Sequence, residues 1–117
     1  MAGEIVHIEY PAGDAGRAAA FWGGLFGWEF GPSMSEEFEY RMARTGENSG
    51  VAVMPGDPGH PNYYYDVPDI EASMAKVKEL GGEAGDKTPV PTHGWFSACK
   101  DSEGNSFSLW QGDASAA

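Results

Sequence analysis

The chain has 117 residues, 41% of them hydrophobic and 13% aromatic, with 18 acidic residues against 7 basic ones and a net charge of −11. This size and composition fit one domain spanning residues 1–117. The acidic balance disfavours nucleic acid and anionic membrane surfaces as partners. The sequence contains no apolar run of 18 residues, so we expect no membrane-spanning helix. The start "MAGEIVHIEY" lacks a secretory pattern, and the single cysteine, Cys99, fits a reducing cytoplasm as a small buried residue.

The first predicted strand contains "IVHIEY", residues 5–10. Residues two apart in a strand share a face, so His7 and Glu9 point one way and Val6, Ile8 and Tyr10 point the other. The apolar set is the one expected to meet a core. A histidine and a glutamate are therefore expected together on the opposite face.

An internal repeat relates the two halves of the chain. "HIEYPAGD" and "NYYYDVPD" are both extended segments that end in an aspartate, Asp14 or Asp69, placed to cap a following helix. Helical spacing of apolar residues predicts helices at about Gly16–Phe26 and Ile70–Leu80. Ala18, Phe21, Trp22 and Leu25 form the apolar stripe of the first helix, where Phe21 and Trp22 are expected to be core. Glycines at 27, 81 and 82 mark the two helix ends.

A constant offset of 55 residues pairs strand, cap and helix end in the two copies. Strand-like segments follow each helix: 27–32, 38–45 and 50–55 in the first copy, and 83–90, 95–100 and 106–111 in the second. The prediction is an α+β fold of two βαβββ modules, at about 4–54 and 62–112, joined by the linker 55–61. Together they would form an incompletely closed, eight-stranded, barrel-like sheet with helices on its convex side. His7 and Glu9 would then face the concave cleft.

Three segments, "IVHIEYPAGDAGRAAAFWGGLFGWEF", "VPDIEASMAKVKELGG" and "KDSEGNSFSLWQ", resemble the vicinal oxygen chelate superfamily. This superfamily includes glyoxalase I, bleomycin-resistance proteins and extradiol dioxygenases. The resemblance covers roughly residues 4–111. It implies the fold above, and in the metal-dependent members it implies a divalent ion held by the first and last strands of each module.

The resemblance can be followed position by position. His7 matches a metal ligand, whereas Asn62 holds the equivalent place in the second module. The last-strand positions fall at Ala52 or Val53 and at Ser108, where the metal enzymes usually carry a glutamate. His7 is thus the only retained ligand, and neither a metal nor another cofactor is expected. A displaced site built from Glu9, His60 and His93 stays open.

The expected cleft lining is aromatic and polar, as in many small-molecule sites. Glu9 also has a simpler interpretation as the partner of Arg41 or Arg44, and His7 as a hydrogen-bonded, partly buried histidine. The candidate catalytic residues are His7 and Glu9. The candidate ligand-binding residues are His7, Glu9, Met54, Asn62, Tyr64, Ser106, Ser108 and Trp110.

Three functions remain open. The first is a metal-independent binding protein of the bleomycin-resistance type that binds a small, flat ligand. The net negative charge of the chain favours a cationic ligand. The second is a glyoxalase-like lyase, isomerase or epimerase that uses a non-standard metal site or a His7–Glu9 acid–base pair. The third is an accessory module with a vestigial cleft. A homodimer is expected, because family members commonly pair and exposed aromatic side chains usually require a partner surface.

Overall fold

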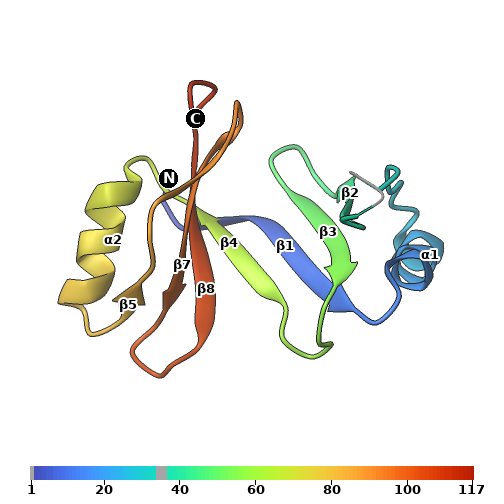
Figure 1. Ribbon diagram of the computed structural model, residues 1–117, viewed down its shortest axis with the longest axis horizontal. Coiled ribbons are helices and arrows are strands. Elements are labelled where there is room, and N and C mark those ends of the chain that lie inside the picture. The colour runs from blue at the N-terminus through green and yellow to red at the C-terminus, as the bar shows by residue number, and fades with distance from the viewer. Residues whose placement is uncertain (1, 34–36) are drawn as a thin grey trace. The chain divides into compact units, whose positions relative to one another are not determined.

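A computed structural model describes residues 2–33 and 37–117 and shows an α+β fold (Figure 1). The described residues form two helices and eight strands: β1 (Glu4–Ala12), α1 (Ala15–Phe26), β2 (Arg41–Arg44), β3 (Gly50–Pro55), β4 (Asn62–Asp66), α2 (Ile70–Glu79), β5 (Glu83–Ala84), β6 (Thr88–Val90), β7 (Gly94–Lys100) and β8 (Ser106–Gly112). The strands belong to one mixed sheet that hydrogen bonds do not close. The predicted fold class is therefore confirmed. No helix among the described residues is long and apolar enough to cross a membrane.

The chain divides into two compact units, which are described separately. The first-module unit is Val6–Asn62, and the second-module unit joins the segment ending at Ile5 to Tyr63–Ala117. Strand β1 begins in the second-module unit and continues into the first-module unit.

Both predicted helices form within one residue of their expected limits, because their caps are local. Asp14 accepts a hydrogen bond from the backbone N–H of Arg17 at 3.0 Å, and Asp69 accepts one from Ala72 at 3.1 Å. Each aspartate satisfies an N–H that has no partner inside its helix. Gly27 ends α1 with a φ of 73°, a left-handed conformation that glycine adopts without steric cost.

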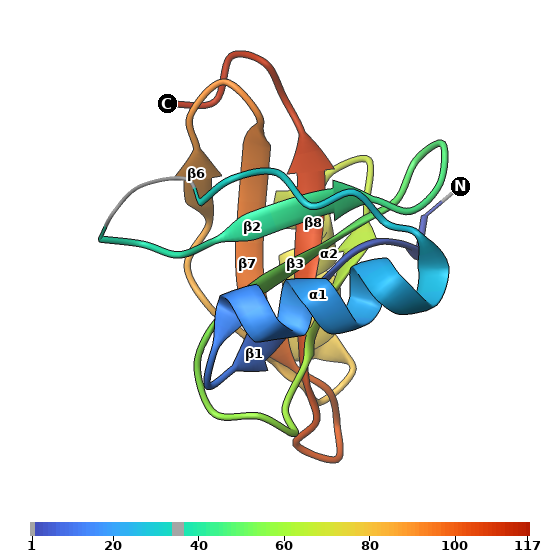
Figure 2. The same cartoon turned by 90° about the vertical axis from the view of Figure 1, so that its right-hand side faces the viewer.

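In the first-module unit, β3 lies between β1, which it pairs in parallel, and β2, which it pairs antiparallel. Helix α1 covers one face of these strands (Figure 2). The ring of Tyr10 stacks on that of Trp22 from α1, with centroids 4.9 Å apart. Val51 and Val53 are buried. The predicted alternation in β1 is confirmed at Tyr10, which meets the helix, while His7 and Glu9 belong to the opposite face.

The apolar stripe of α1 is only partly used. Trp22 packs on the sheet, but Phe21 is 62% exposed and Leu25 is 57% exposed, so the expectation that Phe21 is core is wrong. Successive helical residues are rotated by about 100°. Phe21 consequently points away from the strands and touches Trp22 edge-on, with ring centroids 5.4 Å apart.

The predicted strand at 27–32 does not form. Residues 27–33 have no strand assignment, and the backbone N–H of Gly31 donates a single hydrogen bond to the carbonyl of Met42 at 2.9 Å. Pro32 lacks the N–H that a longer ladder would need at its position. The described part of the first module is thus β1–α1–β2–β3.

In the second-module unit, α2 packs on the sheet through an apolar core of Val67, Ile70, Cys99 and Leu109. Cys99 is 5% exposed, which confirms its interpretation as a small buried residue. Strand β4 pairs in parallel with β8, and β7 pairs antiparallel with β8. The strand predicted at 83–90 is interrupted and forms two short strands, β5 and β6, which both pair with β7.

Candidate functional site

A hydrogen-bonded cluster lies on the face of β1 that α1 does not cover. The hydroxyl of Tyr40 donates to Oε2 of Glu9 at 2.6 Å and lies 2.8 Å from Nε2 of His7. The side-chain amide of Asn62 donates to Oε1 of Glu9 at 3.5 Å. These hydrogen bonds link three residues that the sequence predicted to share a site: His7, Glu9 and Asn62.

Tyr40 is the member of this cluster that sequence reasoning missed. It precedes β2, and its ring stacks on Phe38 with centroids 5.3 Å apart. Alternation along the predicted strand 38–45 could have placed it, because residues two apart in a strand share a face and Tyr40 lies two positions before Met42. Met42 pairs with Ala52, which in turn pairs with Glu9, so a correct register would have placed the phenol on the histidine face.

The arginines do not fill the role expected for them at Glu9. Arg41 forms an ion pair with Glu39 at 3.0 Å. Arg44 donates to the backbone carbonyls of Gly46 and Glu47, at 3.3 Å and 2.6 Å. Glu9 instead accepts hydrogen bonds from a phenol and an amide, which are neutral donors.

The imidazole of His7 is held in a partly desolvated environment. Burial lowers the pKa of His7 below its ordinary value of 6.5, while the negative charge of Glu9 acts in the opposite direction. Desolvation is the larger effect and disfavours the imidazolium. At neutral pH the ring is therefore uncharged.

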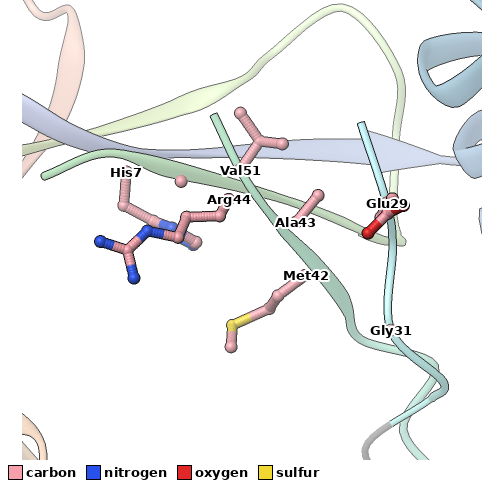
Figure 3. Close-up of a pocket in the computed structure, with 8 residues that line it drawn as sticks. His7, Glu29, Gly31, Met42, Ala43, Arg44 and Val51 are labelled. Carbon is pink, nitrogen blue, oxygen red and sulfur yellow. The ribbon is translucent and has the colours of Figure 1, made fainter. Parts of the chain in front are cut away.

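An open pocket of about 460 Å³ lies next to this cluster in the first-module unit. Its lining residues are His7, Glu29, Gly31, Met42, Ala43, Arg44, Gly50 and Val51. Figure 3 shows the side chains of His7, Met42 and Arg44 on one side of the β2–β3 pair, and those of Ala43 and Val51 on the other. The lining contains one arginine and one glutamate, so the pocket itself is not strongly acidic.

The strand registers resolve which residue of β3 matches Ser108. Glu9 pairs with Ala52 in the first-module unit, and Tyr64, which is 55 positions after Glu9, pairs with Ser108 in the second-module unit. Ala52, and not Val53, is therefore the equivalent of Ser108. The offset between copies increases from 55 to 56 before the last strand, so one extra residue lies in the second copy.

The donor atoms present do not fit the metal site that the family resemblance implies. Alanine supplies no ligand, serine and asparagine are poor transition-metal ligands, and the Tyr40 phenol lies between the imidazole and the carboxylate of the first strand. Residues 2–33 and 37–117 contain no group of three or more His, Cys, Asp or Glu side chains that could hold a metal ion. His93, considered for a displaced site, has its Nδ1 3.0 Å from the carbonyl of Pro91.

The other predicted ligand-binding residues lie outside the pocket lining. Met54 follows Ala52 on the same face of β3 and is partly buried. Four belong to the second-module unit: Tyr64, Ser106, Ser108 and Trp110. Tyr64 contacts Phe96 edge-on at 6.3 Å, Ser108 is 1% exposed, and Ser106 is exposed. Trp110 covers Gly94, where an added Cβ would lie 2.7 Å from the indole.

Solved structures with this fold include enzymes. A methylmalonyl-CoA epimerase from Mycobacterium tuberculosis is 12% identical with a TM-score of 0.72, covering 95% of this chain and 88% of its own. A Streptomyces coelicolor methylmalonyl-CoA epimerase variant, in complex with 2-nitronate-propionyl-CoA, is 16% identical with a TM-score of 0.74, covering 97% and 100%. A hypothetical protein from Bacillus halodurans is 14% identical with a TM-score of 0.75, covering 98% of each chain. At these identities the likeness establishes the fold alone.

No curated protein matches the sequence. The model of the glyoxalase-like domain family matches residues 6–110. This range includes both helices, strands β2 to β7 in full, and most of β1 and β8. This match spans both copies of the repeat and agrees with the fold of the solved structures. The chain therefore belongs to the glyoxalase-like domain family, within the vicinal oxygen chelate superfamily.

Proposed function

We propose that this glyoxalase-like domain binds a small organic molecule in the pocket beside His7, without the divalent metal site of its metal-dependent relatives. The observation that carries the proposal is the pocket itself. Its volume of about 460 Å³ falls within the usual range of small-molecule sites. Its wall combines apolar surface from Met42 with a hydrogen-bonded imidazole.

The ligand we propose is flat and has a polar edge. The thioether of Met42, which is 49% exposed, offers a polarizable surface for a ring. Because Arg44 and Glu29 both line the pocket, its local charge does not select a cation. A preference for cationic ligands would have to come from the net charge of −11 on the whole chain.

The binding test uses thermal melting of the protein with a panel of planar heteroaromatic compounds in neutral, cationic and anionic forms. A ligand that binds only the native state raises Tm as its concentration rises. We expect at least one class to raise Tm in the wild type and to lose most of that effect in Met42→Ala. Leu80→Ala is the matched control, since Leu80 is exposed and lies in the second-module unit. A panel without any such shift would contradict the proposal.

The metal-free part of the proposal has its own test. Melting curves of the wild type and His7→Ala are recorded with and without EDTA, and then with added zinc or nickel. We expect EDTA to leave Tm unchanged in both proteins. A chelator-dependent drop in the wild type that disappears in His7→Ala would make His7 a metal ligand and overturn this part.

A second candidate function, an acid–base isomerase or epimerase, is favoured by the chain of hydrogen bonds from His7 through Tyr40 to Glu9. A neutral imidazole can take a proton from a carbon next to a carbonyl group and return it to the resulting carbanion. The carboxylate, reached through the phenol, would stabilise the transient imidazolium. Exchange of a substrate C–H for deuterium in D2O, lost in His7→Ala, would identify this activity.

We also propose a reducing cytoplasm as the location of the domain, and the single cysteine of the chain, Cys99, which has no second cysteine to pair with in a disulfide, supports this proposal.

A further inference from the structure

We propose that the ligand of this pocket is a small planar acid, and that Arg44 binds its carboxylate through the Nη1–Nη2 end of the guanidinium group. The inference deepens the proposed function, on which it rests for the presence of a ligand in the pocket. It adds the charge of the ligand and names the residue that selects it.

The strand registers place Arg44 and His7 on either side of a glycine. Gly50 of β3 pairs with Arg44 of β2 and with His7 of β1, and all three residues line the pocket. Figure 3 shows the side chains of Arg44 and His7 on the same side of the β2–β3 pair. A Cβ built on Gly50 would lie 3.8 Å from Nδ1 of His7, so it would project into the space between them. Because glycine has no side chain, this end of the pocket stays open beside the guanidinium.

The loop after β2 orients the guanidinium group of Arg44. Its Nε donates a hydrogen bond to the carbonyl of Gly46 at 3.3 Å, and its Nη2 donates one to the carbonyl of Glu47 at 2.6 Å. Nε and Nη2 share one edge of the planar group, so this edge is directed at the loop. Within the described part of the chain, the remaining N–H groups, on Nη1 and Nη2, have no protein acceptor. A parallel pair of such N–H groups matches the two oxygens of a carboxylate.

No carboxylate of the described residues neutralises this guanidinium. The neighbouring arginine of β2, Arg41, forms an ion pair with Glu39 at 3.0 Å, whereas neither ion pair found in residues 2–33 and 37–117 includes Arg44. Glu29 is the acidic residue of the pocket lining, and Figure 3 shows strand β2 between its side chain and that of Arg44. The end of the pocket beside Arg44 therefore carries a positive charge that a ligand can neutralise.

The net charge of −11 opposes an anionic ligand mainly at long range. Salt screens exposed charges beyond about 10 Å at 0.1 M ionic strength, so the groups that touch the ligand determine its affinity. Glu9 lies two residues after His7 on the same face of β1, and its negative charge disfavours a second carboxylate at that end. The acid group is thus directed to Arg44, and the ring of the ligand packs on Met42, which is 49% exposed.

The test compares three probes with one ring and different charges: indole-5-carboxylate, indole-5-carboxamide and indol-5-ylmethylammonium. Their dissociation constants are measured by calorimetry at physiological ionic strength. We expect the carboxylate to bind about tenfold more tightly than the other two probes, since hydrogen bonds between charged groups are the stronger ones. Arg44→Gln should remove this preference and leave the affinity for the carboxamide nearly unchanged.

Arg17→Gln is the matched control. Arg17 is an exposed arginine of α1 in the same first-module unit, and it lies outside the pocket lining, so its replacement changes the net charge equally. The preference for the carboxylate should persist in this variant. A wild type that binds the carboxamide as tightly as the carboxylate would overturn the inference. A preference that survives in Arg44→Gln, or that is lost equally in Arg17→Gln, would also overturn it.

A measurement on the wild type keeps the inference testable if Arg44→Gln does not fold. The chain has three arginines, and their Nε–H groups give separate signals in 1H–15N spectra, of which Arg44→Lys identifies one by its loss. We expect indole-5-carboxylate to shift the Arg44 signal and leave those of Arg17 and Arg41 in place. An unmoved Arg44 signal at saturating probe, or equal shifts of all three, would contradict the assigned contact.

The outcomes separate the inference from the proposed function. If the carboxamide or the ammonium probe binds in the pocket more tightly than the carboxylate, the inference fails and the proposed function stands. If no planar compound binds, the proposed function fails and the inference fails with it.

Discussion

The Tyr40 phenol joins two side chains that lie 33 and 31 positions before it in the sequence. Because these polar groups are partly buried, their hydrogen bonds contribute more to stability than hydrogen bonds at an open surface. Removing the hydroxyl would remove the hydrogen bonds that link Tyr40 to His7 and to Glu9. The residue therefore serves the native structure as well as the pocket.

Tyr40→Phe should accordingly destabilise the protein by about 1–3 kcal/mol, the cost of removing two hydrogen bonds among partly buried polar groups. Urea denaturation followed by circular dichroism measures the change. Tyr63→Phe is the control, since Tyr63 is 36% exposed, and it should change the free energy of unfolding by less than about 0.5 kcal/mol. An equal loss in both variants would show that the Tyr40 hydroxyl has no special role.

The burial of His7 also predicts a pH dependence. Its pKa is lower in the folded state than the ordinary 6.5 of an exposed histidine, so the unfolded chain binds the proton more readily. The stability that depends on neutral His7 is complete above about pH 6.5 and is lost as the pH falls through the folded-state pKa. The free energy of unfolding should fall between about pH 7.5 and pH 5.5 by more in the wild type than in His7→Asn. Equal slopes would contradict the buried neutral imidazole.

At the scale of secondary-structure elements, the two helices begin in the same way but are anchored differently. Asp14 and Asp69 each cap a helix through one backbone N–H. Helix α2 has a second contact at its start, because the side chain of Gln111 in β8 accepts a hydrogen bond from the backbone N–H of Ile70 at 2.8 Å. Ile70 itself is fully buried. Each helix thus has one buried residue, at its first position, and the start of α2 is also tied to the sheet by the hydrogen bond to Gln111.

Each cap predicts a measurable loss. Asp14→Ala and Asp69→Ala should each lower the free energy of unfolding by about 0.5–2 kcal/mol, because each leaves a helix N–H without its side-chain acceptor. Thermal and urea denaturation provide the measurement. Asp57→Ala, at an exposed loop position, is the matched control and should have little effect. A cap variant as stable as this control would argue against the capping geometry.

At the scale of the whole molecule, the exposed apolar residues favour self-association. Phe21, Leu25 and Phe26 of α1 are all more than half exposed, although the chain is strongly acidic elsewhere. Large apolar groups gathered on one helix are uncommon on the surface of a monomer.

The homodimer therefore remains our prediction for the protein in solution. Light scattering at micromolar concentration should give twice the chain mass of 12.5 kDa. A mass of one chain over the whole concentration range would remove the prediction.

The amino-acid sequence by itself determined the features that depend on near neighbours. The alternation in β1, the aspartate caps, the glycine at the end of α1 and the 55-residue repeat were all predictable, because each follows from residues only a few positions apart. The resemblance of three segments to the vicinal oxygen chelate superfamily also lies in the sequence alone. The shared placement of His7, Glu9 and Asn62 followed from the same alternation and repeat.

Only the tertiary structure decided the features that join distant segments. The partners of Glu9 depend on the path of the chain before β2, which brings Tyr40 and not an arginine to the carboxylate. The choice of Ala52 over Val53 required the register of two strands, and a one-residue shift of register reverses the face of every side chain. Phe21 has the spacing of a core residue, yet it is exposed because the sheet contacts a narrower part of α1 than the apolar stripe offers. Local periodicity states which residues can share a face, but the packing of other segments determines what that face meets.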